Sequence, residues 1–190
     1  MKYCSIDIET CGLNEENCDI LEFGAVLDDL KNPIPIKMLP KFHCYFNLPN
    51  YKGEPYALSM HAKIFRRIAE KEKGYTYCSP MKFGYMFKQF LLKNGYESER
   101  DIVSINFAGK NPSSLDIPFL KKKTDISKHI HIRHRIIDPS ILYVKRDDEC
   151  LPNLSECKKR AGMSEHVSHT AIADAIDVVE LLRRGMQYKL

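Results

Sequence analysis

The first ten residues, MKYCSIDIET, constrain the fold of this chain more than any other segment. Apolar side chains at Cys4, Ile6 and Ile8 alternate with polar ones, which is typical of a strand that buries one face. The alternation places Asp7 and Glu9 together on the opposite face. Two carboxylates between apolar neighbours are costly to bury without partners, so this strand is a candidate carrier of a functional site.

The remaining hydrophobic patterns predict an α/β domain with a mixed central sheet flanked by helices. Further strands are predicted over residues 20–28, 42–47, 102–107 and 134–138. Helices are predicted over 57–70, 81–93, a short segment containing Asp116, a segment from Asn153 to Gly162, and about 168–185. This order favours an antiparallel start and parallel later strands. We found no internal repeat or long linker, which predicts a single domain over residues 1–190.

Composition excludes several classes of protein. The longest apolar runs are only a few residues, which excludes a transmembrane helix and a membrane partner. The acids of the first ten residues stand where a signal peptide needs an apolar core. The seven cysteines are odd in number and include no Cys-x-x-Cys pair, so we expect reduced thiols in a cytoplasmic protein.

Positive charge is concentrated in one segment. Residues 121–135 contain six lysines and arginines against one aspartate, a local charge of +5, whereas the whole chain carries +4. A solvated basic loop and a surface that faces phosphates both fit this pattern.

Two further acids and one histidine follow in the later part of the chain. Asp116 comes after a loop rich in Gly, Asn and Ser, and Asp174 lies at the margin of the apolar stripe of the last helix. His169 stands five positions before Asp174. Taken singly, these are an acid near a helix N-terminus, an acid on a helix and a capping histidine. Carboxylate oxygens brought together would suit Mg²⁺ or Mn²⁺ rather than Zn²⁺.

Three segments together resemble a known family. SIDIETCGL, NPSSLDIPFL and HTAIADAIDVVELL are similar, in this order, to the three exonuclease motifs of the DEDD superfamily. The His-x-x-x-x-Asp form of the third motif resembles the branch with a catalytic histidine, which includes oligoribonuclease, ribonuclease T and the proofreading subunit of bacterial replicative polymerase. The resemblance spans residues 3 to about 183 and implies an RNase H-like fold.

The resemblance also implies an activity and an active site. It implies a 3′-to-5′ exonuclease, a phosphodiester hydrolase that removes 5′-mononucleotides from single-stranded ends. Asp7, Glu9, Asp116 and Asp174 would bind two Mg²⁺ or Mn²⁺ ions. His169 would be the general base, and a histidine with a pKa near neutral suits that task.

The resemblance assigns substrate contacts less sharply. They are Thr10 near the terminal sugar, Leu13 beside the terminal base, Tyr56 and His61 as an aromatic-histidine pair, and Arg135 as a basic contact. Packing within the protein is the alternative reading for Leu13 and Tyr56. Short RNA is favoured over DNA, and whether a homodimer forms stays open. The alternatives are a proofreading-type DNA exonuclease acting with a polymerase, and a nucleic-acid-binding module without hydrolysis.

Overall fold

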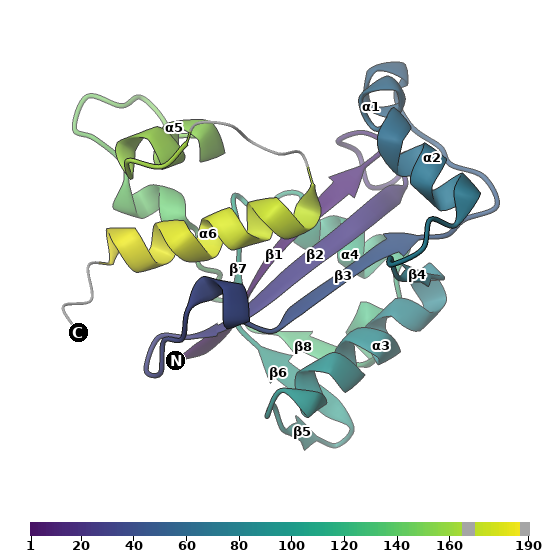
Figure 1. The fold of residues 1–190 in the computed structure, drawn as a ribbon, viewed down its shortest axis with the longest axis horizontal. Helices are drawn as coiled ribbons and strands as arrows, with labels where there is room; N and C mark the ends of the chain where they lie inside the picture. The colour runs from purple at the N-terminus through teal and green to yellow at the C-terminus, as the bar shows by residue number, and fades with distance from the viewer. Residues whose placement is uncertain (165–169, 187–190) are drawn as a thin grey trace.

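A five-stranded mixed sheet forms the centre of the molecule (Figure 1). The structure is a computed structural model that describes residues 1–164 and 170–186. The strand order is β4-β3-β2-β1-β7, with β1 antiparallel to β2, β2 antiparallel to β3, and β7 and β4 added in parallel. The strands are β1 Lys2–Thr10, β2 Ile20–Asp29, β3 Lys41–Phe46, β4 Tyr77–Cys78 and β7 Phe107–Ala108. The expected mixed sheet, antiparallel first and parallel later, is confirmed.

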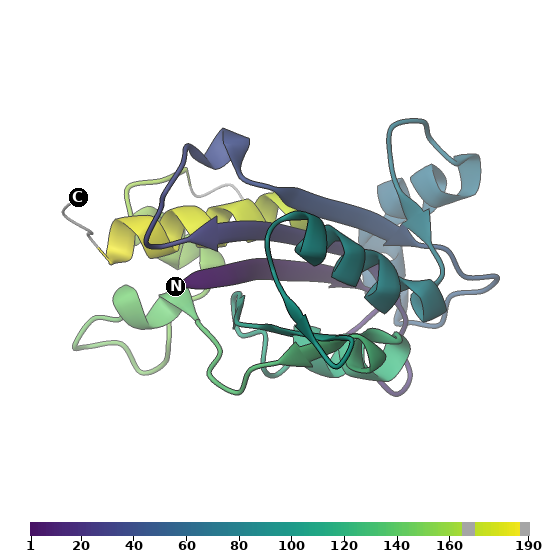
Figure 2. The same ribbon diagram turned by 90° about the horizontal axis from the view of Figure 1, so that it is seen from below.

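A second, three-stranded sheet of order β5-β6-β8 lies below β1 in Figure 2. Its strands are β5 Ser98–Glu99, β6 Ile102–Ile105 and β8 Ile130–Ile132. The prediction of one strand over 102–107 is therefore wrong, because the chain changes sheets at Asn106. The carbonyl of Asn106 accepts a hydrogen bond from the Cys4 amide, and its side chain donates to the Lys2 carbonyl. The strand expected over 134–138 is also wrong, since only Ile137 forms a bridge there, to Ala108.

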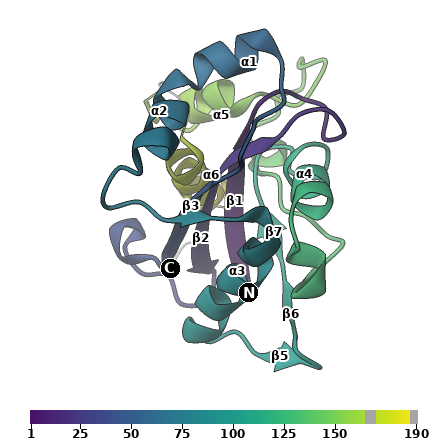
Figure 3. The same ribbon diagram turned by 90° about the vertical axis from the view of Figure 1, so that its right-hand side faces the viewer.

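Helices cover both faces of the central sheet. They are α1 Pro55–Met60, α2 Ala62–Glu70, α3 Pro80–Lys93, α4 Asp116–Lys123, α5 Leu154–Arg160 and α6 Ala171–Gly185. The described residues also form three short 3-10 helices, η1 Ile36–Met38 before α1, and η2 Ile126–Lys128 and η3 Pro139–Leu142 between α4 and α5. Figure 3 shows α6 and α4 on opposite sides of β1. Asn153 caps α5 as predicted, accepting a hydrogen bond from the Glu156 amide.

The side chains of β1 alternate between the two faces of the central sheet, so each face of the strand packs in a different part of the core. Ile6 and Ile8 face the larger core, where Phe23, Phe83 and Phe87 pack with edge-to-face and stacked rings. The other face of β1 lies against α6, and the Ser5 hydroxyl donates to the Ala175 carbonyl at 2.8 Å. The polar face of the strand is thus held against a helix rather than exposed to solvent.

The helix expected over 57–70 is interrupted. It is two helices, α1 and α2, that meet at His61, where φ and ψ are −93° and 20°. The His61 side chain is 4% exposed, and its Nε2 lies 3.5 Å from Oε2 of Glu9. The break turns this histidine inward, toward the acids of β1.

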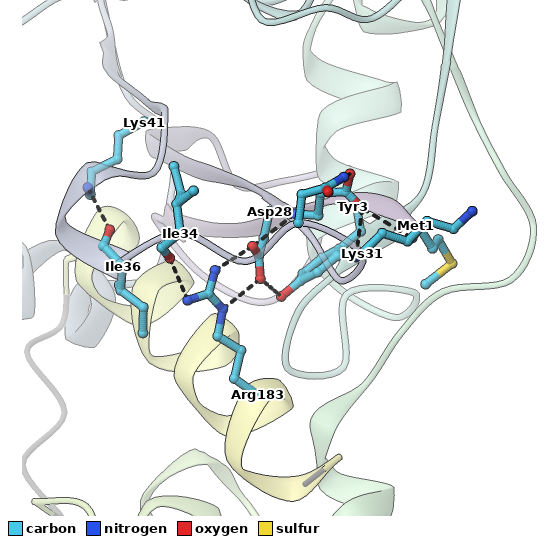
Figure 4. A network of polar contacts seen from close by, with 10 residues as sticks. Met1, Tyr3, Asp28, Lys31, Ile34, Ile36, Lys41 and Arg183 are labelled. Atoms are coloured by element: carbon cyan, nitrogen blue, oxygen red, sulfur yellow. Dashed lines mark hydrogen bonds and ion pairs between the residues drawn. The ribbon is translucent and has the colours of Figure 1, made fainter. Parts of the chain in front are cut away.

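Helix α6 is fastened to the sheet near its C-terminal end by a polar network (Figure 4). Nε and Nη2 of Arg183 donate to the two carboxylate oxygens of Asp28 at 3.0 and 2.6 Å. The Tyr3 hydroxyl donates to the same carboxylate at 2.8 Å, and Arg183 also donates to the Ile34 carbonyl. A bidentate arginine–carboxylate pair fixes both the distance and the relative orientation of the two side chains. It therefore fixes the rotation of α6 on the sheet.

Two further properties bear on the expectations from composition. All seven cysteines are free thiols. Across residues 1–164 and 170–186, no helix has both the length and the apolar character needed to cross a membrane.

Candidate active site

Three carboxylates meet where β1 and the start of α6 adjoin. Asp7 and Glu9 lie on the face of β1 that α6 covers, and Asp174 lies in the first turn of α6. One ligand oxygen from each of the three lies within 4.8 Å of the others. Residues 165 positions apart in the sequence therefore form one cluster of acids.

A glycine on β2 permits this approach. Gly24 is paired with Asp7, and the backbone of α6 passes directly over it. A Cβ atom on Gly24 would lie 2.3 Å from the Ala171 carbonyl carbon and 2.4 Å from the Ile172 nitrogen, far inside contact distance. The missing side chain is what lets the first turn of α6 rest on the sheet and bring Asp174 to the acids of β1.

Asp116 approaches the cluster from the other side of β1. It is the first residue of α4 and is 4% exposed. Hydrogen bonding to its own backbone and to that of Ile8 lowers its pKa, but burial outweighs this and raises the pKa to about 7. Its charge raises the pKa of both Asp7 and Glu9, so the four predicted acids form one electrostatic group.

Burial and the negative charges of neighbouring carboxylates dominate the electrostatics of Asp7 and Glu9. Burial, followed by the charges of Asp116, Glu9 and Asp174, raises the pKa of Asp7 well above its ordinary value. Burial and the charges of Glu22, Asp174 and Asp116 raise the pKa of Glu9 to about 8. Buried carboxylates that repel one another are stabilised either by protons or by cations. A donor set made of carboxylate oxygens fits Mg²⁺ or Mn²⁺.

Two residues that the sequence analysis did not single out lie behind the cluster. Glu22 stands opposite Glu9 in the β1–β2 ladder and is fully buried. Its Oε1 lies 2.6 Å from Nε2 of His43 on β3. Its Oε2 is buried and has no hydrogen-bond partner among the described residues. The signal in the sequence was Glu22 itself, a single acid within the apolar run ILEFGAVL.

The predicted substrate-binding residues are placed differently from one another. Thr10 is buried at the end of β1, and its hydroxyl donates to the Gly12 carbonyl at 2.6 Å. Leu13 and Tyr56 are 75% and 78% exposed. A hydrogen bond from the Glu54 amide to the Cys11 carbonyl joins the two segments that carry Leu13 and Tyr56, beyond the end of β1.

The remaining predicted residues do not join the acids in the same way. His61 contacts Glu9 rather than projecting outward with Tyr56. Arg135 is exposed in the segment after β8, and no described contact connects it with the acids. His169, predicted as the general base, lies outside the described residues.

Comparison with solved structures assigns the fold. The first similar structure is cell-death related nuclease 4 (CRN-4), with a TM-score of 0.64 and 14% identity over 99% of this chain and 64% of that one. The second is E. coli exonuclease I in complex with a dT13 oligonucleotide, with a TM-score of 0.63 and 15% identity over 96% of this chain and 41% of that one. The fold is RNase H-like. This RNase H-like chain spans less than two thirds of the length of either protein.

The sequence itself has no such match. Comparison with protein-family models and with curated proteins finds none. The similarity between this RNase H-like domain and the two nucleases is therefore one of fold, and it places the acidic cluster on a framework that both nucleases use.

Proposed function

We propose that this chain is a metal-dependent 3′-to-5′ exonuclease that hydrolyses single-stranded nucleic-acid ends, with short RNA favoured over DNA. The observation that carries the proposal is the convergence of Asp7, Glu9 and Asp174 within 4.8 Å, with buried Asp116 adding its charge to the same cluster. The shared fold of two nucleases, one of them bound to an oligonucleotide, supports the same class of substrate.

Each acid has a distinct structural task in this proposal. Asp7 and Glu9 are fixed by the β1–β2 ladder, Asp174 by the contact of α6 with Gly24, and Asp116 by its contact with the Ile8 backbone. Held in this way, the four side chains would bind two Mg²⁺ or Mn²⁺ ions. Such ions, when bound, stabilise the charges of the attacking and leaving oxygens of a phosphodiester. The protein would contribute a rigid arrangement that needs little reorganisation.

His169 completes the proposal as the general base that accepts the proton of the attacking water. The role is taken from the sequence resemblance, in which the histidine precedes Asp174 by five positions. A general base contributes about 10²- to 10⁴-fold to a rate. The variant His169→Ala should therefore reduce turnover by that factor and remove the acidic limb of the pH–rate profile.

The exposed side chains beyond β1 would bind the terminal nucleotide. Leu13 and Tyr56 present apolar surface to solvent from two linked segments. Stacking of a base on an aromatic ring is worth about 1–3 kcal/mol, which would suffice to order a single-stranded end. Substitution of Tyr56 by Ala should accordingly raise KM more than it lowers kcat.

The test is stepwise degradation of labelled oligonucleotides of matched RNA and DNA sequence, with Mg²⁺ or Mn²⁺. A 5′ label should yield a ladder of shortened products, and a 3′ label should appear at once in mononucleotide. Asp7→Ala should abolish the ladder, whereas Asp147→Ala, which removes an exposed acid, should not. Binding without shortening would replace the proposal with a binding module. Faster DNA degradation, with co-purification of a polymerase, would favour a proofreading-type exonuclease.

A further inference from the structure

A second site is suggested by a hollow between α4 and the segment that follows β8. It has a volume of about 200 Å³. Its apolar floor is formed by Ile117, Ile132 and Ile136, and its basic rim by Lys121, Arg133 and His134. Among the described residues, no acidic side chain lines this hollow, whereas carboxylates line the hollows beside Asp28, beside Glu97 and beside Asp177.

The charges on this rim are not neutralised by the protein. Within the described part of the chain, Lys121, Arg133 and His134 form no ion pair, and all three are exposed. The two lysines that follow Lys121 differ. Lys122 pairs with Glu16 at 2.7 Å, and Lys123 pairs with Asp19 at 3.4 Å. Of the three consecutive lysines, the one that lines the hollow is the one left available for a ligand.

The hollow begins beside the acidic cluster. Ile117 of the floor directly follows Asp116, the first residue of α4. Lys121 lies one turn after Ile117 on the same side of the helix. Lys121 stands five positions after Asp116, about 7.5 Å along the helix axis and about 140° around it. A strand with its end at the acids would therefore have to follow the surface of α4 to reach the rim.

We propose that this hollow binds an internal nucleotide of a single-stranded polynucleotide whose 3′ end occupies the acidic cluster. The nucleotide's phosphate is held by Lys121 and Arg133, and its base lies over the three isoleucines. The proposal rests on the proposed function, since it deepens the description of the same substrate. It gives a role to two of the six lysines and arginines of residues 121–135.

The test compares two double variants that lose the same charge. Lys121→Ala/Arg133→Ala removes the rim of the hollow. Lys122→Ala/Lys128→Ala removes one paired lysine and one exposed lysine that does not line it. Affinity for fluorescent two- and ten-nucleotide single strands is measured by anisotropy in Ca²⁺ over a range of salt concentrations.

The rim variant should bind the ten-nucleotide strand at least about 10-fold more weakly, because two phosphate contacts are lost. The slope of log K against log salt should fall by about 0.7, because the contacts to one phosphate are lost. The control variant should change the affinity less than about twofold. Equal losses in both variants would overturn the proposal, since they would indicate diffuse attraction. Wild-type binding in Ca²⁺ without strand shortening in Mg²⁺ or Mn²⁺ would overturn the exonuclease proposal alone, and the comparison of the two double variants would still test the hollow.

Discussion

Gly24 of β2 and Ala171 of α6 approach so closely that no side chain fits between them. This contact lies beside Asp7 in the ladder and three residues before Asp174 in the helix. It therefore determines the distance between two of the acids. An arrangement of this kind couples stability to function, because the same backbone contact supports both the packing of α6 and the geometry of the cluster.

We therefore expect Gly24→Ala to disrupt both the packing of α6 and the geometry of the acidic cluster. The added methyl group must displace the first turn of α6, and overpacking of this kind costs about 1–3 kcal/mol or more. We expect the midpoint of thermal unfolding to fall and nuclease activity to fall by at least 100-fold. Gly74→Ala is a suitable control, because it introduces strain at φ +92° in a loop where no atom lies within 4 Å. A Gly24→Ala enzyme with full activity would show that α6 is not held by this contact.

The metal-free protein should become less stable as the pH rises. The pKa of Glu9 is raised to about 8 and that of Asp116 to about 7, so the folded state binds more protons than the unfolded state. Stability from these groups is complete below about pH 4 and is lost as the pH passes through 7 to 8. Urea denaturation in EDTA at pH 5, 6, 7 and 8 measures this loss. Millimolar Mg²⁺ or Mn²⁺ should reverse it, because a ligand of the folded state stabilises that state.

We expect Asp7→Asn to increase the stability of the metal-free protein and to lower nuclease activity. The amide keeps the size of the side chain but removes a buried charge that the neighbouring acids repel. At pH 8 without metal, we expect the free energy of unfolding to increase by on the order of 1–2 kcal/mol. Nuclease activity should fall by at least about 1000-fold, as one ligand of a preorganised charged site is lost. Asp147→Asn, at an exposed position, should change neither quantity.

The contribution of the buried Glu22–His43 pair to stability can be measured by comparing a single variant with a double variant. His43→Leu leaves the Glu22 carboxylate buried without its partner, which we expect to cost about 3 kcal/mol. Glu22→Leu/His43→Leu removes both polar groups and should recover at least half of that loss. Chemical denaturation of the two variants and the wild type provides the comparison. Equal destabilisation in both variants would mean that the two side chains act independently.

Local sequence patterns predicted which segments form strands and helices better than they predicted which strands pair with one another. The alternation in β1 and the apolar runs of β2 and β3 specified strands, because each pattern is complete within a few residues. The same reasoning failed for residues 102–107. The segment IVSINF is short and mostly apolar, and its pattern does not predict that hydrogen bonds between Asn106 and β1 end one strand and start another.

The sequence by itself determined the alternation that puts Asp7 and Glu9 on one face and the mixed α/β class, because both follow from short-range periodicity. The grouping of these two acids with Asp116 and Asp174 was what the resemblance of the three motifs implied. The tertiary structure alone decided that Glu22 and His43 stand behind the acids, that His61 turns inward to Glu9, and that Gly24 admits α6. These relationships join residues that are distant in the chain. They depend on strand register and helix packing, which arise only when the whole core is assembled.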